Sequence, residues 1–219
     1  MGMRVQEIFT GVSGECGSFL QGSWCTFVRL AGCNLRCKWC DTVRAQEESS
    51  GVEVSVAEVA RILKEKKNRQ ILITGGEPLL QMAGVENLVG YAGPNFSYQI
   101  ETNGSILPSE LLLEKACCVF DFKLESSGMM KSMLPLHVFS ALPYPHWIKF
   151  VIADKADYED AKRAAAIINT QWWVSNIAFS ACPPGMTHNE LYQRMKTDGL
   201  TDVLLSVQIH KLAALIETD

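Results

Sequence analysis

Three cysteines, Cys33, Cys37 and Cys40, fall within eight residues of the chain, in the segment GCNLRCKWCDT. This segment directly follows an apolar stretch, CTFVRLAG, that is typical of a buried strand. Iron–sulfur clusters take thiolate ligands, so three cysteines on one loop can hold three corners of a 4Fe–4S cubane. The spacing C-x3-C-x2-C therefore predicts a cluster with one iron that has no protein ligand.

A fourth iron without a protein ligand can be chelated by a small molecule. S-adenosylmethionine (SAM) offers an amino group and a carboxylate for this purpose. An electron from the cluster then breaks the sulfonium bond and leaves a 5′-deoxyadenosyl radical. The cysteine spacing thus indicates radical chemistry that uses SAM.

Other interpretations of the three cysteines remain open. A structural zinc site wants four ligands, and Asp41 or a distant histidine or cysteine could complete one. Buried free cysteines with no ligand role are common, although three at this spacing on a loop after a strand argue against that role. Disulfides are rare in a reducing compartment.

Polar residues also follow the other predicted strands. In ILITGGEPLL, Gly75 and Gly76 let the backbone approach a ligand closely, and Glu77 could receive a cationic amino group. The same letters also begin an ordinary strand–turn–helix connection. Asn-Gly is likewise a common turn pair, and a lone histidine at a strand end is more often structural. The remaining polar residues inside or after strands are Glu101, Thr102, Asn103, Asp121, Lys123, Lys149, Gln208 and His210.

Arg29 lies inside the first apolar strand. An inward guanidinium needs an anion or a paired acid. A substrate carboxylate would satisfy it with two parallel hydrogen bonds. The sequence therefore favours an anionic substrate.

These residues need elements that bring the ends of several strands together. Strands alternating with helices predict a mainly parallel sheet, and such sheets place their chemistry at the carboxyl ends of the strands. A full eight-unit barrel takes about 250 residues, so we expect an α/β fold with a partial TIM-like barrel and one domain over residues 1–219. Residues 125–146 contain three prolines and no clean helix. The predicted strands are Cys25–Leu30, Ile71–Thr74, Tyr98–Glu101, Cys118–Phe122, Trp147–Ile152, Ile177–Ser180 and Val203–Gln208. Helices are predicted at Val56–Lys66 (capping box Ser55 and Glu58), Leu79–Tyr91, Ser109–Lys115, Tyr158–Ile168 (cap Asp157) and from Thr187 to Met195 (capping box Thr187 and Glu190).

Composition restricts the partners. The net charge of −4 argues against a nucleic-acid binder. No apolar run approaches the ~20 residues of a membrane span, and the N-terminal residues lack the apolar stretch of a signal peptide. We therefore expect a cytoplasmic protein with no membrane partner.

Seven segments of the chain resemble the 7-carboxy-7-deazaguanine synthase (QueE) family of radical SAM enzymes. They are EIFTGVSGE, FVRLAGCNLRCKWCDT, ITGGEPLLQ, ETNG, DFKLESSGM, IKFVI and VQIHK. The CWC-DT ending is more specific than the cysteine spacing, which all radical SAM enzymes share. The resemblance implies that 6-carboxy-5,6,7,8-tetrahydropterin is rearranged to 7-carboxy-7-deazaguanine with loss of ammonia. It also implies that the radical takes a hydrogen from C6 of the pterin and that SAM is regenerated after the ring contracts. A homodimer, Mg²⁺ and a reductant protein such as flavodoxin or ferredoxin are implied as well.

The resemblance also assigns roles to individual residues. It implies that Cys33, Cys37 and Cys40 bind the 4Fe–4S cluster and that Thr42 binds Mg²⁺. The residues implied for SAM are Trp39, Cys40, Asp41, Gly76, Asp121, Phe122 and Lys123. Those implied for the substrate are Val12, Ser13, Gly14, Arg29 and Thr74.

The chain departs from the family at one turn. The family commonly reads Q-G-E-G there, whereas this chain has Ser13, Gly14, Glu15 and Cys16. Backbone contacts survive this change and a glutamine side-chain contact does not. Some relatives place their terminal carboxylate near the substrate; here LAALIETD continues past His210, so Asp219 is given no such role.

Two further functions compete with this one. A radical SAM activase, which makes a glycyl radical on a partner protein, would share the cysteine triad and GGEP. An iron–sulfur electron carrier or a zinc module would need a fourth protein ligand and would not need GGEP.

Overall fold

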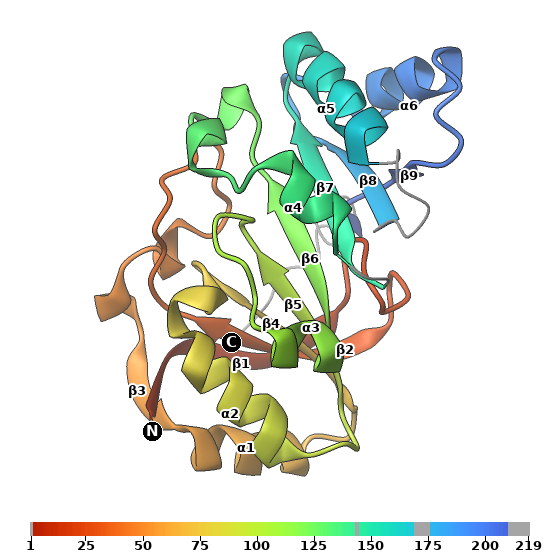
Figure 1. The fold of residues 1–219 in the computed structure, drawn as a ribbon. Coiled ribbons are helices and arrows are strands. Elements are labelled where there is room, and N and C mark those ends of the chain that lie inside the picture. Colours follow the sequence, from red (N-terminus) through yellow and green to blue (C-terminus); the bar gives the residue numbers. More distant parts are fainter. Residues whose placement is uncertain (1, 143–144, 169–175, 210–219) are drawn as a thin grey trace.

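A computed structural model describes residues 2–142, 145–168 and 176–209, and within them one nine-stranded sheet runs in the order β3-β1-β2-β4-β5-β6-β7-β8-β9 (Figure 1). The strands are β1 (Gly2–Val12), β2 (Trp24–Leu30), β3 (Val52–Ser55), β4 (Gln70–Gly75), β5 (Ser97–Thr102), β6 (Ala116–Phe122), β7 (Trp147–Ile152), β8 (Asn176–Ala181) and β9 (Leu204–Leu205). The helices are α1 (Val56–Glu65), α2 (Met82–Ala92), α3 (Glu110–Lys115), α4 (Leu136–Ser140), α5 (Lys155–Ile168) and α6 (His188–Thr197).

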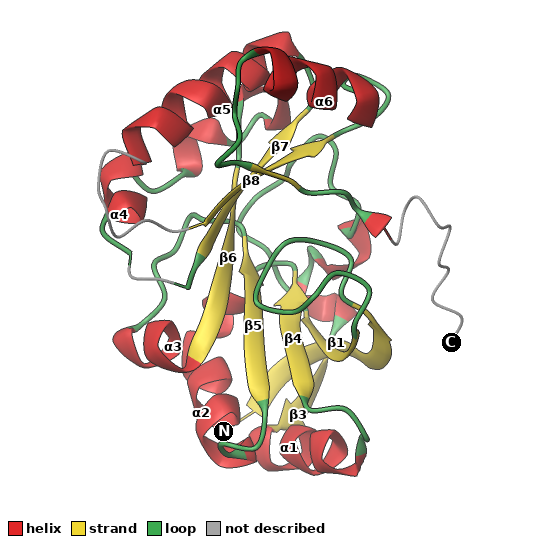
Figure 2. Cartoon of the chain, turned by 90° about the vertical axis from the view of Figure 1, so that its right-hand side faces the viewer, coloured by secondary structure: helices red, strands yellow, loops and turns green. Residues whose placement is uncertain are grey.

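From β2 to β9 each neighbouring pair of strands is parallel. The sheet curves, and the helices lie along its outer side (Figure 2). Apolar residues of helices and strands, such as Leu63 of α1 and Ile73 of β4, share one buried core. The order of strands does not return to its start, which confirms the expected α/β fold with an incomplete barrel.

Two strands were not predicted. β1 pairs antiparallel with β2, and β3 pairs antiparallel with β1 at the edge of the sheet. Residues of β3 are mostly exposed, so main-chain pairing with β1 supports this strand rather than burial of an apolar face. Its weak apolar pattern explains why the sequence did not reveal it.

The ends of some helices also differ from the predictions. α5 begins at Lys155, because the Asp154 carboxylate accepts a hydrogen bond from the Asp157 amide at 2.9 Å. Asp157 is therefore inside the first turn and does not cap the helix as predicted. Residues Pro78–Gln81 form a 3₁₀ turn before α2, so the helix expected from Leu79 starts at Met82.

Three smaller predictions have clear outcomes. Thr187 and Glu190 form the full capping box of α6, whereas at α1 only the bond from the Glu58 amide to the Ser55 hydroxyl is present. The described residues of the segment 125–146, which leave out 143–144, form 3₁₀ turns and only the five-residue α4, as its prolines suggest. β9 is shorter than predicted, because its pairing with β8 ends at the hydrogen bond from the Ser206 amide to the Phe179 carbonyl.

Among the described residues, no helix has the length and apolar character needed to cross a membrane.

Candidate active site

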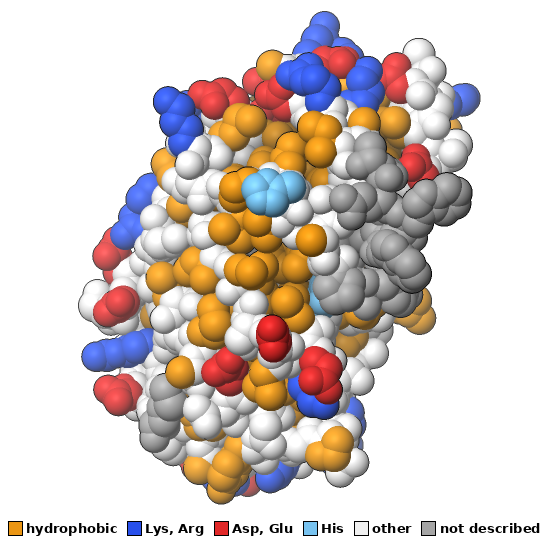
Figure 3. Space-filling model, in the orientation of Figure 1, with side chains coloured by type: hydrophobic (Ala, Val, Ile, Leu, Met, Phe, Trp, Pro, Cys, Tyr) orange, Lys and Arg blue, Asp and Glu red, His pale blue; other side chains and the backbone are white. Residues whose placement is uncertain are grey.

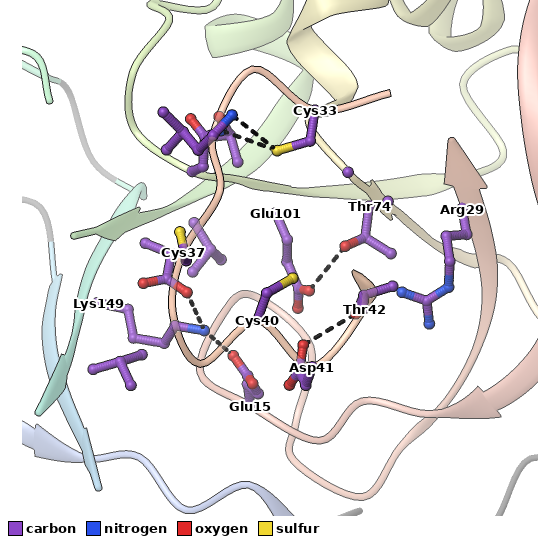
Figure 4. Close-up of a pocket in the computed structure, with 18 of the residues that line it drawn as sticks. Glu15, Arg29, Cys33, Cys37, Cys40, Asp41, Thr42, Thr74, Glu101 and Lys149 are labelled. Atoms are coloured by element: carbon purple, nitrogen blue, oxygen red, sulfur yellow. Dashed lines mark hydrogen bonds and ion pairs between the residues drawn. The ribbon is translucent and has the colours of Figure 1, made fainter. Parts of the chain in front are cut away.

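A cavity of about 700 Å³ opens at the carboxyl ends of the parallel strands (Figure 4). The loop after β2 forms one side of it, and the ends of β4, β5, β6 and β7 form the others. Residues far apart in the sequence meet there, as expected for a barrel mouth. Predicted site residues that line it are Val12, Gly14, Arg29, Cys33, Cys37, Trp39, Cys40, Asp41, Thr42, Thr74, Gly76, Asp121 and Lys123.

Two predicted residues do not line this cavity. Ser13 is fully buried, and its amide bonds the Ser23 carbonyl at 2.8 Å. The Phe122 side chain packs on the outer face of the sheet, 5.5 Å from the Phe139 ring. Since neighbours on a strand point to opposite faces, only the main chain of Phe122 can reach the cavity beside Asp121. His210 lies outside the described residues.

The loop with the three cysteines is fixed by its backbone. The Cys33 amide bonds the Gln46 carbonyl at 2.8 Å, and the Lys38 amide bonds the Ser127 carbonyl at 3.0 Å. All three thiols are free and partly exposed, and all three line the cavity. Burial raises the pKa of the Cys33 and Cys37 thiols, so metal loading must displace protons from them.

The donor set fits a cluster better than a single ion. No group of three or more histidine, cysteine, aspartate or glutamate side chains within the described ranges is placed to hold one metal ion. A cubane instead takes its thiolates at separate corners. Three thiols on one loop at the wall of a large cavity suit that geometry, and the cavity has room for a chelating molecule beside them.

The glycine pair at the end of β4 packs against the end of β2 and the loop that follows it. A Cβ on Gly75, whose φ is 143°, would lie 2.1 Å from the Leu30 carbonyl oxygen. A Cβ on Gly76 would lie 2.2 Å from the Gly32 carbonyl oxygen. Both residues also line the cavity. Packing therefore requires both glycines, since no side chain fits between the end of β4 and the backbone of Leu30 and Gly32. Close approach of a ligand to the backbone, the predicted reason for the pair, is a separate one.

Glu77 is not available to a ligand. It is 0% exposed, and its carboxylate accepts bonds from the Asn103 amide at 2.7 Å and the Thr102 hydroxyl at 2.8 Å. The Leu79 amide donates a third bond at 2.9 Å. Burial raises the pKa of Glu77, and these hydrogen bonds oppose the rise. The expectation that Glu77 receives a cationic group was wrong, because its carboxylate joins the loops after β4 and β5.

Arg29 has the paired acid that its position requires. Its Nε donates to Glu7 Oε1 at 2.6 Å, and its guanidinium lies 5.6 Å from the centroid of the Phe9 ring. Glu7 and Arg29 are directly opposite each other on the antiparallel strands β1 and β2. Arg44 also donates to Glu7 Oε1, at 2.6 Å. One carboxylate thus orients two guanidinium groups at the edge of the cavity.

A row of buried charges crosses the wall of the cavity. Lys149 pairs with Glu15 and, at 3.3 Å, with Asp121, which also pairs with Lys123 at 2.9 Å. Gln208 donates to the other oxygen of Glu15. Although burial acts to raise it, the two lysines hold the pKa of Asp121 below its usual range. Burial opposes the charge of Lys149 too, yet Asp121 and Glu15 raise its pKa.

Glu101 faces the same cavity from β5. The Thr74 hydroxyl donates to Glu101 Oε2 at 3.4 Å. Burial, together with the negative charge of Glu15, raises the pKa of Glu101 to about 7, although Lys149 and Arg29 oppose the rise. The sequence analysis placed Glu101 at the end of a predicted strand without a specific role and gave Glu15 no role. A carboxylate beside an Asn-Gly turn carries no sign of burial in the sequence.

Comparison with known proteins identifies the class of this chain. The model of the radical SAM superfamily matches residues 28–197 of the chain. Among solved structures, QueE from Escherichia coli has the same fold with a TM-score of 0.71, 22% identity and 94% coverage of both chains.

Curated relatives define the family within that class. The 7-carboxy-7-deazaguanine synthase of Clostridium acetobutylicum is 34% identical over 97% of this chain and 96% of its own length. The one from Leptospira interrogans is 33% identical over 94% of this chain and 93% of its own length. The chain belongs to the 7-carboxy-7-deazaguanine synthase family.

Proposed function

We propose that the chain converts 6-carboxy-5,6,7,8-tetrahydropterin to 7-carboxy-7-deazaguanine with loss of ammonia. The observation that carries this proposal is the near-full-length match to a curated 7-carboxy-7-deazaguanine synthase. The cavity supports it, because three cysteines, a paired arginine, Glu101 of β5 and Glu15 of the loop after β1 face one space. The match favours this reaction over the formation of a glycyl radical on a partner protein, and residues 1–219 act as one domain.

The radical SAM class implies a 4Fe–4S cluster and SAM. When bound, SAM supplies the 5′-deoxyadenosyl radical that begins the reaction. Cys33, Cys37 and Cys40 hold the cluster. The backbone of Trp39, Asp41, Gly76 and Phe122 and the charged groups of Asp121 and Lys123 hold SAM beside it.

The substrate binds on the opposite side of the cavity, against β1, β2 and the turn after β1. The Arg29 guanidinium, oriented by Glu7, meets the substrate carboxylate. Glu15 and Glu101 face the N–H groups of the pterin, which a carboxylate can accept. Val12, Gly14 and Thr74 complete this side, and Ser13 holds the turn through its buried main chain.

Magnesium and the partners are finer parts of the proposal. Thr42 binds Mg²⁺ through its hydroxyl, which donates to Asp41 Oδ1 at 3.0 Å. Mg²⁺ needs few protein oxygens when substrate oxygens and water supply the rest. The protein works in the cytoplasm with flavodoxin or ferredoxin as reductant. A second copy covers hydrophobic side chains that gather on the face over α4 and between α4 and α3 (Figure 3).

Anaerobic turnover tests the proposal. Reconstituted protein is incubated with SAM, a reductant and 6-carboxy-5,6,7,8-tetrahydropterin, and the products are separated by mass. We expect 7-carboxy-7-deazaguanine with little net loss of SAM. No product, together with SAM cleavage only when a partner protein is added, would instead support the activase.

A further inference from the structure

One loop between β1 and β2 forms part of the proposed substrate side of the cavity. Residues 13–23, here called the floor loop, pass inside the barrel between β1 and β2. The Ser18 amide bonds the Gln99 side chain of β5 at 3.0 Å, and the Cys16 amide bonds the Ser206 hydroxyl at 3.2 Å. The Ile209 amide bonds the Gly14 carbonyl at 3.1 Å. The floor loop therefore touches both the middle of the sheet and its last described segment.

A continuous set of polar contacts leads from the floor loop to the cysteine loop. We define the charge ladder as Gln208, Glu15, Lys149, Asp121, Lys123 and Trp39. Its first members join the last described segment, the floor loop and β7. Its last step places the Lys123 ammonium 4.9 Å from the centroid of the Trp39 ring, between Cys37 and Cys40 in sequence. The indole N–H of Trp39 donates to the Ser126 hydroxyl at 3.3 Å.

Lys149 is the central member of this ladder. Its side chain is 7% exposed and lies between Glu15 at 11% and Asp121 at 21%. Asp121 and Lys149 are also register partners on β6 and β7. Without the ammonium, Glu15 would keep only the Gln208 amide and Asp121 only Lys123, and the two carboxylates would face each other with no cation between them in a poorly solvated space. They would then move apart, and each belongs to a different half of the cavity.

We propose that Lys149 is a positioning residue that couples SAM binding to substrate binding through the charge ladder. This inference rests on the proposed function for the identity of the substrate. One side of Lys149 fixes Asp121 and Lys123, which face SAM. The other side fixes Glu15 on the floor loop, which faces the pterin. Because both ion pairs are buried, ordering of one half by its ligand orders the other half too.

The test is a binding cycle on anaerobically reconstituted protein. The dissociation constant of 6-carboxypterin, an oxidised analogue, is measured by titration calorimetry with and without SAM, and SAM is also titrated alone. In the unaltered protein we expect SAM to tighten 6-carboxypterin about 5-fold or more. In Lys149→Met this factor should fall to about 1, and SAM alone should bind at least about 3-fold more weakly.

Three further variants separate positioning from folding. Lys149→Arg keeps a charge between the acids and should restore much of the coupling. The double variant Lys149→Met, Glu15→Gln also removes the Glu15 carboxylate, which has lost its ammonium partner. It replaces the single variant in the test if that variant does not fold, and it should still lack coupling. Lys162→Met is the matched control, because Lys162 pairs with Asp198 at 2.8 Å and Glu159 at 3.0 Å on the outer helices. It should leave both affinities unchanged.

Two results would overturn the inference: a factor within 2-fold of 1 in the unaltered protein, or unchanged coupling in Lys149→Met. If 6-carboxypterin does not bind the unaltered protein at all, the proposed function fails. The SAM titration then tests the charge ladder by itself. If Lys149→Met binds SAM as tightly as the unaltered protein does, the role of Lys149 in positioning the SAM side is refuted.

Discussion

The two faces of β6 and β7 differ sharply although they belong to the same strands. On the outer face, the rings of Phe120, Phe122 and Phe150 join a buried aromatic cluster. On the inner face, Asp121 and Lys149 form a buried ion pair. Alternation along a strand makes this possible. Buried charges are weak contributors to stability, whereas buried rings are strong ones, so the outer face stabilises the fold and the inner face carries the proposed ligand contacts.

The largest expected effect is on the inner side. Cys37→Ala should abolish both the cluster and turnover, because two thiolates cannot hold the cubane. Iron and sulfide content, visible absorption and product formation measure this. Cys182→Ala is the matched control, since Cys182 also lines the cavity but lies outside the triad, and it should keep its iron. Retained turnover in Cys37→Ala would remove this residue from the cluster.

The outer face should show its effect in stability. Phe150 is fully buried, with its ring 5.4 Å from Phe122 and 5.8 Å from Phe179. Phe150→Ala should lower the free energy of unfolding by about 3–5 kcal/mol, because a cavity replaces the ring. Urea unfolding followed by circular dichroism measures it. A loss under about 1 kcal/mol would show that the aromatic cluster does not hold the sheet.

Glu101, on the inner face of the sheet, should make the free energy of unfolding depend on pH. Its pKa is about 7 in the folded chain against an ordinary 4.5, so folding favours the protonated carboxyl. This contribution is complete below about pH 4.5 and is lost as the pH rises through about 7. Glu101→Gln should remove that loss, worth at most about 3 kcal/mol because solvent in the cavity screens the charge.

Urea unfolding at several pH values between 4.5 and 8 measures this contribution. Glu65→Gln, on the exposed side of α1, is the control and should follow the unaltered protein. Equal pH slopes in Glu101→Gln and the unaltered protein would show that the inner carboxylate carries no such penalty.

A smaller effect is expected at the edge of the inner side. Thr42→Ala should leave the iron content unchanged and weaken activation by Mg²⁺ about tenfold, because one hydroxyl ligand is lost. Turnover measured against Mg²⁺ concentration shows the shift. An unchanged metal response would take Thr42 out of the metal site.

The smallest effect belongs to the solvent side of the helices. Lys162→Met breaks exposed ion pairs with Asp198 and Glu159 and should leave the midpoint of thermal unfolding almost unchanged, because water screens such pairs. Thermal unfolding measures it. A large drop in that midpoint would mean that surface pairs hold α5 and α6 together as strongly as the aromatic cluster holds the sheet.

The sequence predicted the parallel part of the fold because that part carries its own signals. Apolar runs such as Ile71–Thr74 coincide with buried strands, and the capping box of Thr187 and Glu190 forms as expected. The cysteine spacing and the residues after the strands were enough to predict which loops meet. The comparisons confirm the family on which the detailed assignments depend.

Other features depend on pairing across long distances in the chain and could not be predicted. Arg29 finds Glu7 only through the register of β1 and β2. Asp157 was predicted to cap a helix, but it links two segments instead. Its carboxylate accepts a hydrogen bond at 3.2 Å from the Ser126 amide of another loop. Glu77 looks solvent-exposed in the sequence, and only the fold reveals that three donors surround it.

The floor loop has a consequence for biosynthesis. Cys33, Cys37 and Cys40 leave the ribosome early, and the backbone hydrogen bonds of their loop need only residues up to Ser127. The floor loop, in contrast, bonds Ser206 and Ile209, about 190 positions later. The partners of the cysteine loop are thus synthesised well before Ser206 and Ile209, so the floor loop is the later of the two to gain all its contacts.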